Sequence, residues 1–401
     1  MDLLAPSDYL VLLEIFLFLA VAQLIRLAAQ KVGFPEIVAD LLAGMILGVY
    51  ALGGILNGLL GVSIFGLQSG LLLFADFSVV LLLFSAGLGG GVASLRRAGL
   101  GAVGAAVAGD LLAFAVTVAV VGRFVPLDSA LFLGVAAAAT SAAVSVSLLR
   151  SERLGGSRGV QFFVNASALD DVVALVLLSV VTSILAGGSA PLELTGTVAA
   201  AVVGWLVLLV ASVVIIPRLV RLPILRRIET LPFAVLFALI AIVLALGFSP
   251  IIGAYMAGLA IAESVVAPRT RLLTEALVGI FGALFFIVVG AQFEIGLLRD
   301  PALLGFALLL AGTAAVGKVA GVYPFARGAL RDDGAARAVA IGMIPRGEIG
   351  LLVGTIGYAA GFLTAQMLGA VVLMSIFTTL GGSLLFRRYA RHLRDPSSPP
   401  A

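Results

Sequence analysis

Two adjacent aspartates, Asp170 and Asp171, lie in the middle of an apolar segment long enough to cross a membrane, NASALDDVVALVLL at 165–178. A charge at the centre of a bilayer costs about 2.5–3.5 kcal/mol on insertion scales, so the pair indicates a function there. Neighbouring residues on a helix point about 100° apart, so the two carboxylates cannot face one partner equally. We expect one to hold a cation while the other pairs with a base; a purely structural ion pair is the alternative.

A lysine in another apolar segment, Lys318, is the candidate base. The chain has two lysines against 22 arginines, yet this position within AGTAAVGKVAGVY holds a lysine. A desolvated lysine can lose its proton, whereas an arginine effectively cannot. Lys318 is therefore predicted to be a proton switch, a structural partner for an acid, or both.

A third charged segment, IGMIPRGEIGLL at 341–352, combines helix-breaking residues with charge. Pro345 and Gly347 would interrupt the helix, and Arg346 and Glu348 stand at the interruption. A broken helix in a membrane exposes backbone carbonyls and half-helix dipoles, which need a countercharge or a cation. The segment therefore predicts an ion-handling break.

A second break is predicted in AAAATSAAVSVS, where Thr140 and Ser141 stand among small residues. Ordinary polar packing between membrane helices is the alternative for these hydroxyls, but the charged break elsewhere favours a role beside an ion.

Three further acids fall within apolar segments, and for each a functional role and a structural ion pair are both open: Asp40, Asp76 and Asp110.

The composition indicates which class of protein must position these side chains. Hydrophobic residues make up 62% of the 401 residues and charged residues 11%, with a mean hydropathy of +1.24. Soluble domains carry about 25% charged residues, so we expect a polytopic membrane protein and exclude a soluble enzyme. The lack of cysteine excludes disulfides and thiolate metal sites, and a single histidine, His392, excludes a multi-histidine metal site. No cofactor and no enzymatic activity is expected.

Apolar stretches of about 18 or more residues recur along the chain, which is typical of transmembrane helices and not of a β-barrel. The expected fold class is an all-α polytopic membrane protein with about thirteen transmembrane helices. The predicted spans are residues 9–29, 35–53, 68–90, 100–122, 129–149, 160–186, 194–216, 230–247, 249–266, 273–291, 301–325, 335–358 and 364–386.

The basic residues predict the orientation of these spans. With the N-terminus outside, 20 of the 24 Lys and Arg residues fall in inside loops or in the tail. Only Arg123 and Arg299 fall outside, and Lys318 and Arg346 lie within spans. The positive-inside rule therefore predicts an external N-terminus and a cytoplasmic C-terminus.

An internal repeat is also indicated. PEIVADLLAGMIL from Pro35 is similar to PIIGAYMAGLAI from Pro250, and each next span contains a related segment, LLLFSAGL at 81–88 and LFFIVVGA at 284–291. Two six-helix halves joined by a linker helix at 194–216 would be inverted relative to each other, as in many transporters. Chance similarity between glycine-rich apolar helices is the alternative.

Together these motifs resemble the second branch of the monovalent cation:proton antiporters, and within it the NapA-type sodium/proton antiporters. The segment GFSPIIGAYMAGLAIAES at 247–264 also resembles the S-P-x-x-G-A-x-x-A-G helix of that family, and the similarity covers about residues 10–390. The resemblance implies two crossing broken helices in a core that moves as an elevator against a fixed dimer domain. The implied parts are dimer-domain helices at 1–90 and 230–291, core helices at 100–186 and 301–386, the linker helix, and a basic cytoplasmic tail at 387–401.

The resemblance also implies roles for the charged residues. Asp171 would be the main cation and proton carboxylate, and Asp170 would pair with Lys318 until the cation arrives. Two acids plus a lysine resemble the electrogenic members of the family. The remaining implied roles are a place beside the ion for Thr140 and Ser141, and support of the broken helices by Arg346 and Glu348.

The expected function is therefore exchange of Na⁺ or Li⁺ for H⁺ across the cell membrane by a homodimer, without a nucleotide-binding regulatory domain, nucleotide or nucleic acid. A K⁺/H⁺ exchanger or K⁺ efflux system on the same fold is the main alternative. An intramembrane aspartyl protease needs two aspartates on separate helices, which the adjacent Asp170 and Asp171 cannot supply. A symporter for an organic anion would not be expected to place Lys318 near the acids.

Overall fold

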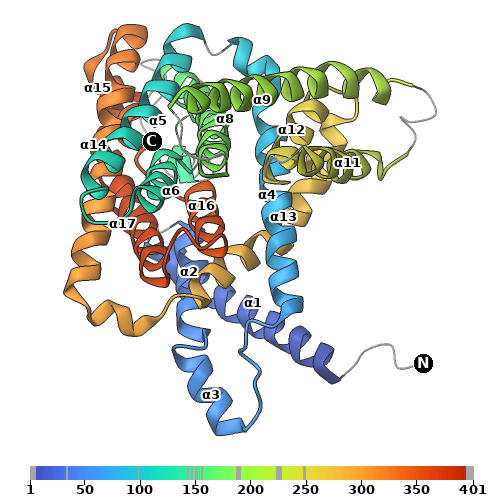
Figure 1. The fold of residues 1–401 in the computed structure, drawn as a ribbon, viewed down its shortest axis with the longest axis vertical. Helices are drawn as coiled ribbons and strands as arrows, with labels where there is room; N and C mark the ends of the chain where they lie inside the picture. The colour runs from blue at the N-terminus through green and yellow to red at the C-terminus, as the bar shows by residue number, and fades with distance from the viewer. Residues whose placement is uncertain are drawn as a thin grey trace.

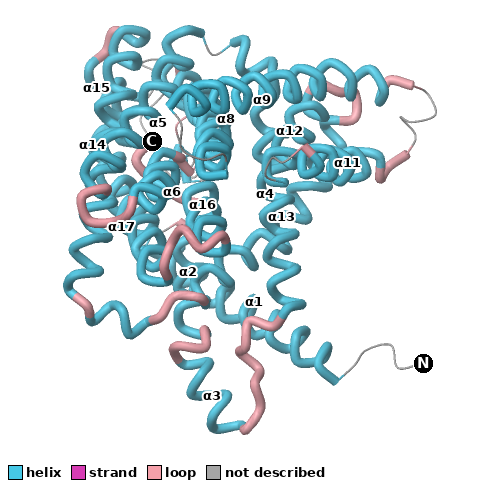
Figure 2. The backbone as a smooth tube through the Cα atoms, in the orientation of Figure 1, coloured by secondary structure: helices cyan, strands magenta, loops and turns pink. Residues whose placement is uncertain are grey.

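The computed structural model consists of helices and connecting turns over the part of the chain that it describes (Figures 1 and 2). The described residues are 6–32, 35–97, 99–141, 144–145, 148–149, 152, 154, 157–186, 191–222, 228–246 and 250–393. Several predicted features lie outside them: the start of the 247–264 motif, the tail from 394, and Arg150, Arg153, Arg226 and Arg227 of the predicted inside loops.

The helices follow the predicted spans closely. They are α1 (Pro6–Val32), α2 (Glu36–Leu47), α3 (Leu52–Leu60), α4 (Ser69–Arg97), α5 (Gly99–Val121), α6 (Leu127–Ala138), α8 (Arg158–Ala186), α9 (Pro191–Val220), α11 (Leu231–Ala245), α12 (Pro250–Ala262), α13 (Ala267–Ala291), α14 (Pro301–Leu330), α15 (Asp333–Gly342), α16 (Glu348–Ala359) and α17 (Ala365–Tyr389). Short 3₁₀ turns, Ile295–Arg299 and Ala390–Leu393, precede α14 and follow α17.

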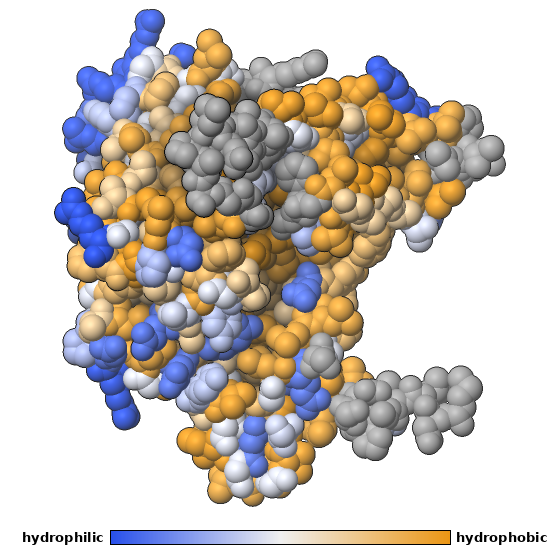
Figure 3. Space-filling view, viewed as in Figure 1, coloured by the Kyte–Doolittle hydropathy of each residue, from blue (hydrophilic) through white to orange (hydrophobic). Residues whose placement is uncertain are grey.

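Within the described residues, nine spans are long and apolar enough to cross a membrane, and α6, α11, α12 and α16 are shorter apolar helices. An all-helical polytopic membrane protein is therefore confirmed, whereas the count of thirteen spans stays a prediction. The short helix α3 was not predicted as an element of its own. The visible surface is covered largely by apolar side chains, as expected of a protein that faces lipid (Figure 3).

Two groups of helices make the most extensive contacts. The first bundle contains α1, α2, α4, α11, α12 and α13, and the second bundle contains α5, α6, α8 and α14 to α17. Helix α9 contacts α8 of the second bundle and α12 of the first, and it runs across the top of the molecule in Figure 1. The packing thus separates the two sets of helices that the sequence assigned to a dimer domain and a core, although their roles stay predictions.

Glycines bring four helices of the first bundle into close contact. A Cβ on Gly44 of α2 would overlap the backbone of α13, and one on Gly290 of α13 would overlap the backbone of α2. The same relation holds between Gly87 of α4 and Gly258 of α12. Small residues let membrane helices approach to backbone contact, so both crossings are tight. Reciprocal crossings of this kind are what two inverted halves would produce, but the repeat itself stays a prediction.

The two predicted helix breaks lie against each other in the second bundle. Helix α6 ends at Ala138 and continues as extended backbone, while α15 ends at Gly342 and α16 begins only at Glu348. The backbone N–H of Ser141 in the first break donates to the carbonyl of Pro345 in the second, at 2.9 Å. This crossing brings together residues about two hundred positions apart in sequence, and it is where the candidate site lies.

Candidate ion-binding site

Helix α8 carries the adjacent aspartates to the crossing, and their side chains go to different places. Both are buried, with exposed fractions of 0% for Asp170 and 3% for Asp171. Asp170 is directed to Lys318 on α14, whereas Asp171 lines a cavity. The divergence follows from the angle of about 100° between successive side chains on a helix.

Lys318 lies between two carboxylates rather than against one. Its Nζ donates to Asp170 Oδ1 at 2.5 Å and also to Asp110 Oδ1 on α5. All three side chains are fully buried. The predicted Asp170–Lys318 pair is therefore present, and Asp110, whose role the sequence left open, completes a buried triad. The only sequence signal for Asp110 was its depth in an apolar span.

Asp170 also connects this triad to the first break. Its Oδ2 accepts a hydrogen bond from the backbone N–H of Thr140 at 2.7 Å. The Thr140 hydroxyl in turn donates to the carbonyl of Met343 in the second break at 3.0 Å. The backbone N–H and hydroxyl freed by the unwinding of α6 are thus satisfied by α8 and by the other broken helix, as buried polar groups require.

Arg346 fills the space between the breaks. Its guanidinium donates to the Thr140 hydroxyl at 3.1 Å, to the Met343 carbonyl at 3.2 Å and to the Ala314 carbonyl at 3.0 Å. The carbonyls at the C-terminal end of a helix carry a partial negative charge, so this cation stabilises the end of α15. The role of helix support implied for Arg346 agrees with these contacts.

Hydroxyls on α17 that were not predicted from the sequence hold the backbone of Arg346. Ser375 and Thr379 both donate to its carbonyl at 2.8 Å, and the hydroxyl of Thr378 accepts from its N–H at 3.2 Å. These three residues occupy one face of α17 at spacings of three and four. That spacing could have been noticed, but hydroxyls in membrane helices pack in the same way without any site nearby.

The buried charged side chains at the crossing offset one another, with the exception of Asp171. In their ionised forms Asp110 and Asp170 offset Lys318 and Arg346, and all four have an exposed fraction of 0%. Asp171 adds a further carboxylate, and its buried Oδ1 has no hydrogen-bond partner among the described residues. A buried carboxylate without a partner is strongly disfavoured unless a proton or a cation neutralises it.

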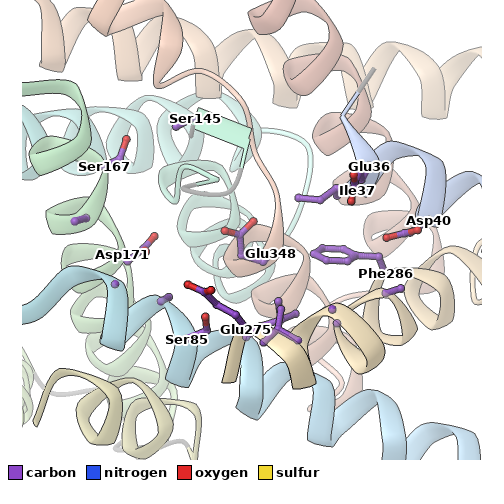
Figure 4. Close-up of a pocket in the computed structure, with 18 of the residues that line it drawn as sticks. Glu36, Ile37, Asp40, Ser85, Ser145, Ser167, Asp171, Glu275, Phe286 and Glu348 are labelled. Carbon is purple, nitrogen blue, oxygen red and sulfur yellow. The ribbon is translucent and has the colours of Figure 1, made fainter. Parts of the chain in front are cut away.

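Asp171 faces a cavity of about 790 Å³ between the two bundles (Figure 4). Its walls come from α2, α4 and α13 on one side and from α8 and α16 on the other. Glu348, in the first turn of α16, also lines it, and its carboxylate accepts a hydrogen bond from the Ser141 hydroxyl at 2.6 Å. All seven residues predicted for the site thus meet at the crossing or at this cavity.

Asp40 and Asp76, the other two acids noted within predicted spans, are not part of the triad. Asp40, at the edge of the same cavity, accepts two hydrogen bonds from Arg26, at 2.7 and 2.6 Å. Of the two roles left open for Asp40, the structure therefore contains the structural ion pair. Glu36 lies 3.5 Å from the same arginine. Asp76 is exposed on α4 and is not among the residues that line the cavity.

A helical membrane bundle with two crossing breaks around an uncompensated carboxylate has the architecture of a secondary transporter. Residues 16–391 match the family described as sodium/hydrogen exchanger, transmembrane, and the chain belongs to this family. It is accordingly a transporter protein and not an enzyme, as the sequence predicted.

Several antiporters are similar to the chain over most of their length. The high-affinity Na⁺/H⁺ antiporter NhaS3 of Synechocystis is 28% identical, with 87% of this chain and 83% of the relative covered. A Na⁺/H⁺ antiporter of Enterococcus hirae is 26% identical, covering 90% and 94%. The Na⁺/H⁺-K⁺ antiporter GerN of Bacillus cereus is 27% identical, covering 92% and 93%.

The fold is also similar to that of a solved antiporter. The sodium proton antiporter MjNhaP1 from Methanocaldococcus jannaschii superimposes with a TM-score of 0.72 over 94% of this chain and 96% of that one, at 17% identity. The likeness extends the family assignment to the three-dimensional arrangement of the helices. The match to the family model and the similar antiporters confirm the predicted relationship to the cation:proton antiporters.

Proposed function

We propose that this protein exchanges Na⁺ or Li⁺ for H⁺ across the cell membrane, with Asp171 as the carboxylate for which the cation and the proton compete. One observation carries the proposal: Asp171 is buried, lines the cavity and has an oxygen without a partner among the described residues. The names of the similar antiporters from Synechocystis and Enterococcus hirae support sodium as the cation.

Competition at Asp171 is sufficient to couple the two ions. Burial favours the neutral form of a carboxyl group, so the empty site takes up either a proton or a cation. A site that holds the cation or its protons carries less net charge than the empty site, so it can change its access from one side of the membrane to the other at a lower cost in free energy. Each cycle then exchanges the cation for protons. Thr140 and Ser141 lie at the first break, where their oxygens could serve the same ion.

The proposed movement is that of an elevator, in which the second bundle carries the site past the first. The tight glycine crossings of α2 with α13 and α4 with α12 suit a rigid part that also forms the homodimer. The cavity in this structure is lined by Arg26 and Arg271, near the inner ends of α1 and α13 under the positive-inside rule. This state would therefore open to the cytoplasm, with the N-terminus outside.

Exchange is proposed to be electrogenic, with more than one proton moved per cation, because Asp171 is not the only carboxylate at the site: Glu348 lines the same cavity. An imposed membrane potential should then change the rate of exchange, and its sign should set the preferred direction.

Potassium is the second candidate cation. The observation that favours it is the relative GerN, whose name includes K⁺ and which is 27% identical over 374 residues. Carboxylate, hydroxyl and carbonyl oxygens bind either ion, so the same site chemistry serves both.

The test is an ion-driven pH change in proteoliposomes. Purified protein is reconstituted with an imposed pH gradient, reported by a fluorescent dye, and NaCl, LiCl or KCl is added. We expect Na⁺ and Li⁺ to dissipate the gradient and Asp171→Asn to abolish the response. Dissipation by K⁺ alone would replace the sodium proposal with the potassium one. Full exchange by a folded Asp171→Asn protein would refute the site.

A further inference from the structure

Lys318 is enclosed in a way that does not suit a proton switch. Asp110 and Asp170 both accept from its ammonium group, and all three side chains are fully buried. Among the described residues that line the cavity, none belongs to this triad. Loss of the lysine proton would deprive two neighbouring buried carboxylates of the cation that both contact, which is strongly unfavourable.

Glu348 lines the cavity that Asp171 faces, where a second proton-carrying group would have to lie. It is half-buried, and Figure 4 shows its carboxylate and that of Asp171 directed into the same cavity from α16 and α8. Ser141, from the other break, donates to one Glu348 oxygen at 2.6 Å. Two carboxylates in one desolvated cavity repel when both are ionised, so together they favour a bound cation or bound protons.

We propose that Glu348 is the second carboxylate of the transport site: with Asp171 it contacts the cation and carries a second proton, while Lys318 remains charged throughout the cycle. The inference rests on the proposed function and specifies its stoichiometry. When Na⁺ binds, the carboxyl protons of Asp171 and Glu348 pass to water in the cavity. When Na⁺ leaves on the other side, both oxygens take protons from water there.

The charged groups around Glu348 support this assignment. Glu348 lies in the first turn of α16, where the helix dipole attracts an anion, and it shares the cavity with Asp171. The Arg26–Asp40 pair at the cavity edge is balanced by its own hydrogen bonds. The described charged groups facing the cavity from the surrounding elements are Arg26 of α1, Glu36 and Asp40 of α2, Asp171 of α8, and Arg271 and Glu275 of α13.

Glu348→Gln separates a proton-carrying role from a structural one. The glutamine carbonyl oxygen can still accept the Ser141 hydrogen bond, so support of the break is retained while the titratable group is removed. Glu275→Gln is the matched control, because it makes the same chemical change on an exposed glutamate lining the same cavity.

The first measurement records net charge movement on a solid-supported membrane, in parallel with the pH response of proteoliposomes. We expect wild type and Glu275→Gln to move charge on a sodium jump, and Glu348→Gln to exchange without net charge. Charge movement by Glu348→Gln at the wild-type ratio to exchange would overturn the inference. Electrically silent exchange by wild type would also overturn it and the proposed electrogenicity, but leave cation/proton exchange at Asp171 standing. A wild type that does not exchange would refute both.

A second measurement decides the case in which Glu348→Gln binds sodium but does not transport. Calorimetric titration with sodium in buffers of different ionisation enthalpy gives the protons released per ion bound. We expect Glu348→Gln to release half as many as wild type; an equal number would overturn the inference. Loss of sodium binding with an unchanged melting temperature would support contact with the cation. The same loss with a lowered melting temperature would assign Glu348 a structural role and refute the proposal.

Discussion

The triad around Lys318 makes the most quantitative prediction. Lys318→Met keeps most of the side-chain volume but removes the cation that Asp110 and Asp170 share. All three groups have an exposed fraction of 0%, so water cannot compensate. Removing one partner of a buried ion pair costs about 3–5 kcal/mol. At about 2 °C per kcal/mol, the lower end of the range for larger domains, the melting temperature should fall by about 6–10 °C.

The assay is thermal unfolding of the purified protein in detergent without sodium, followed by tryptophan fluorescence or by loss of the monodisperse peak. Lys31→Met is the matched control, because it removes the chain's other lysine from an exposed position at the end of α1. We expect the control to unfold at the wild-type temperature.

A double variant tests the cause of the loss. Asp170→Asn added to Lys318→Met removes one uncompensated carboxylate, while the asparagine oxygen can still accept from the Thr140 N–H. Part of the lost stability should therefore return, with a coupling energy above about 0.5 kcal/mol. A Lys318→Met protein as stable as Lys31→Met, or a double variant with no recovery, would refute the triad as a stabilising unit.

Three further predictions concern the site and its scaffold. Asp171→Asn should abolish sodium-driven proton movement at an unchanged melting temperature, measured by dye response and thermal unfolding; a large drop in that temperature would show a structural role instead. Sodium at a hundred times its Kd should stabilise wild type by about 2.7 kcal/mol, and choline should not; an equal sodium effect on Asp171→Asn would place the cation elsewhere. Gly258→Leu should force α12 from α4 and lower the melting temperature, whereas Gly312→Leu, which has open space on α14, should not; equal effects in a thermal scan would contradict the tight crossing.

The sequence predicted the parts of the site that carry an obvious cost in a membrane. Asp170, Asp171 and Lys318 were identifiable because each would be expensive in an apolar span without a purpose. Pro345 and Gly347 made one break identifiable. The charged residues at that break then favoured a functional role for the hydroxyls of Thr140 and Ser141 over ordinary polar packing. The spans followed from hydropathy, since a bilayer requires long apolar runs.

The sequence did not indicate which neighbouring helix each side chain faces around its own helix axis. Helix α5 is apolar on all sides, so no polar stripe indicated that Asp110 faces α14. Its contact with Lys318 spans 208 positions, which no local pattern can predict. The pairing of Asp40 with Arg26 was equally hidden, because it depends on how closely α1 and α2 pack. The hydroxyls of α17 were missed for the same reason.

The way the breaks are held has a consequence for how the protein is made. The Ser141–Pro345 bond joins the two halves of the chain, and the backbone of Arg346 is held by Ser375 and Thr379 of the last long helix. The ion site therefore cannot assemble until α17 has been synthesised and inserted. During synthesis the acids Asp110 of α5 and Asp170 of α8 precede Lys318 of α14, the cation that they share. The crossing of the two breaks is thus completed only with the last long helix in place, which makes α17 a condition for a formed site although none of its described residues lines the cavity.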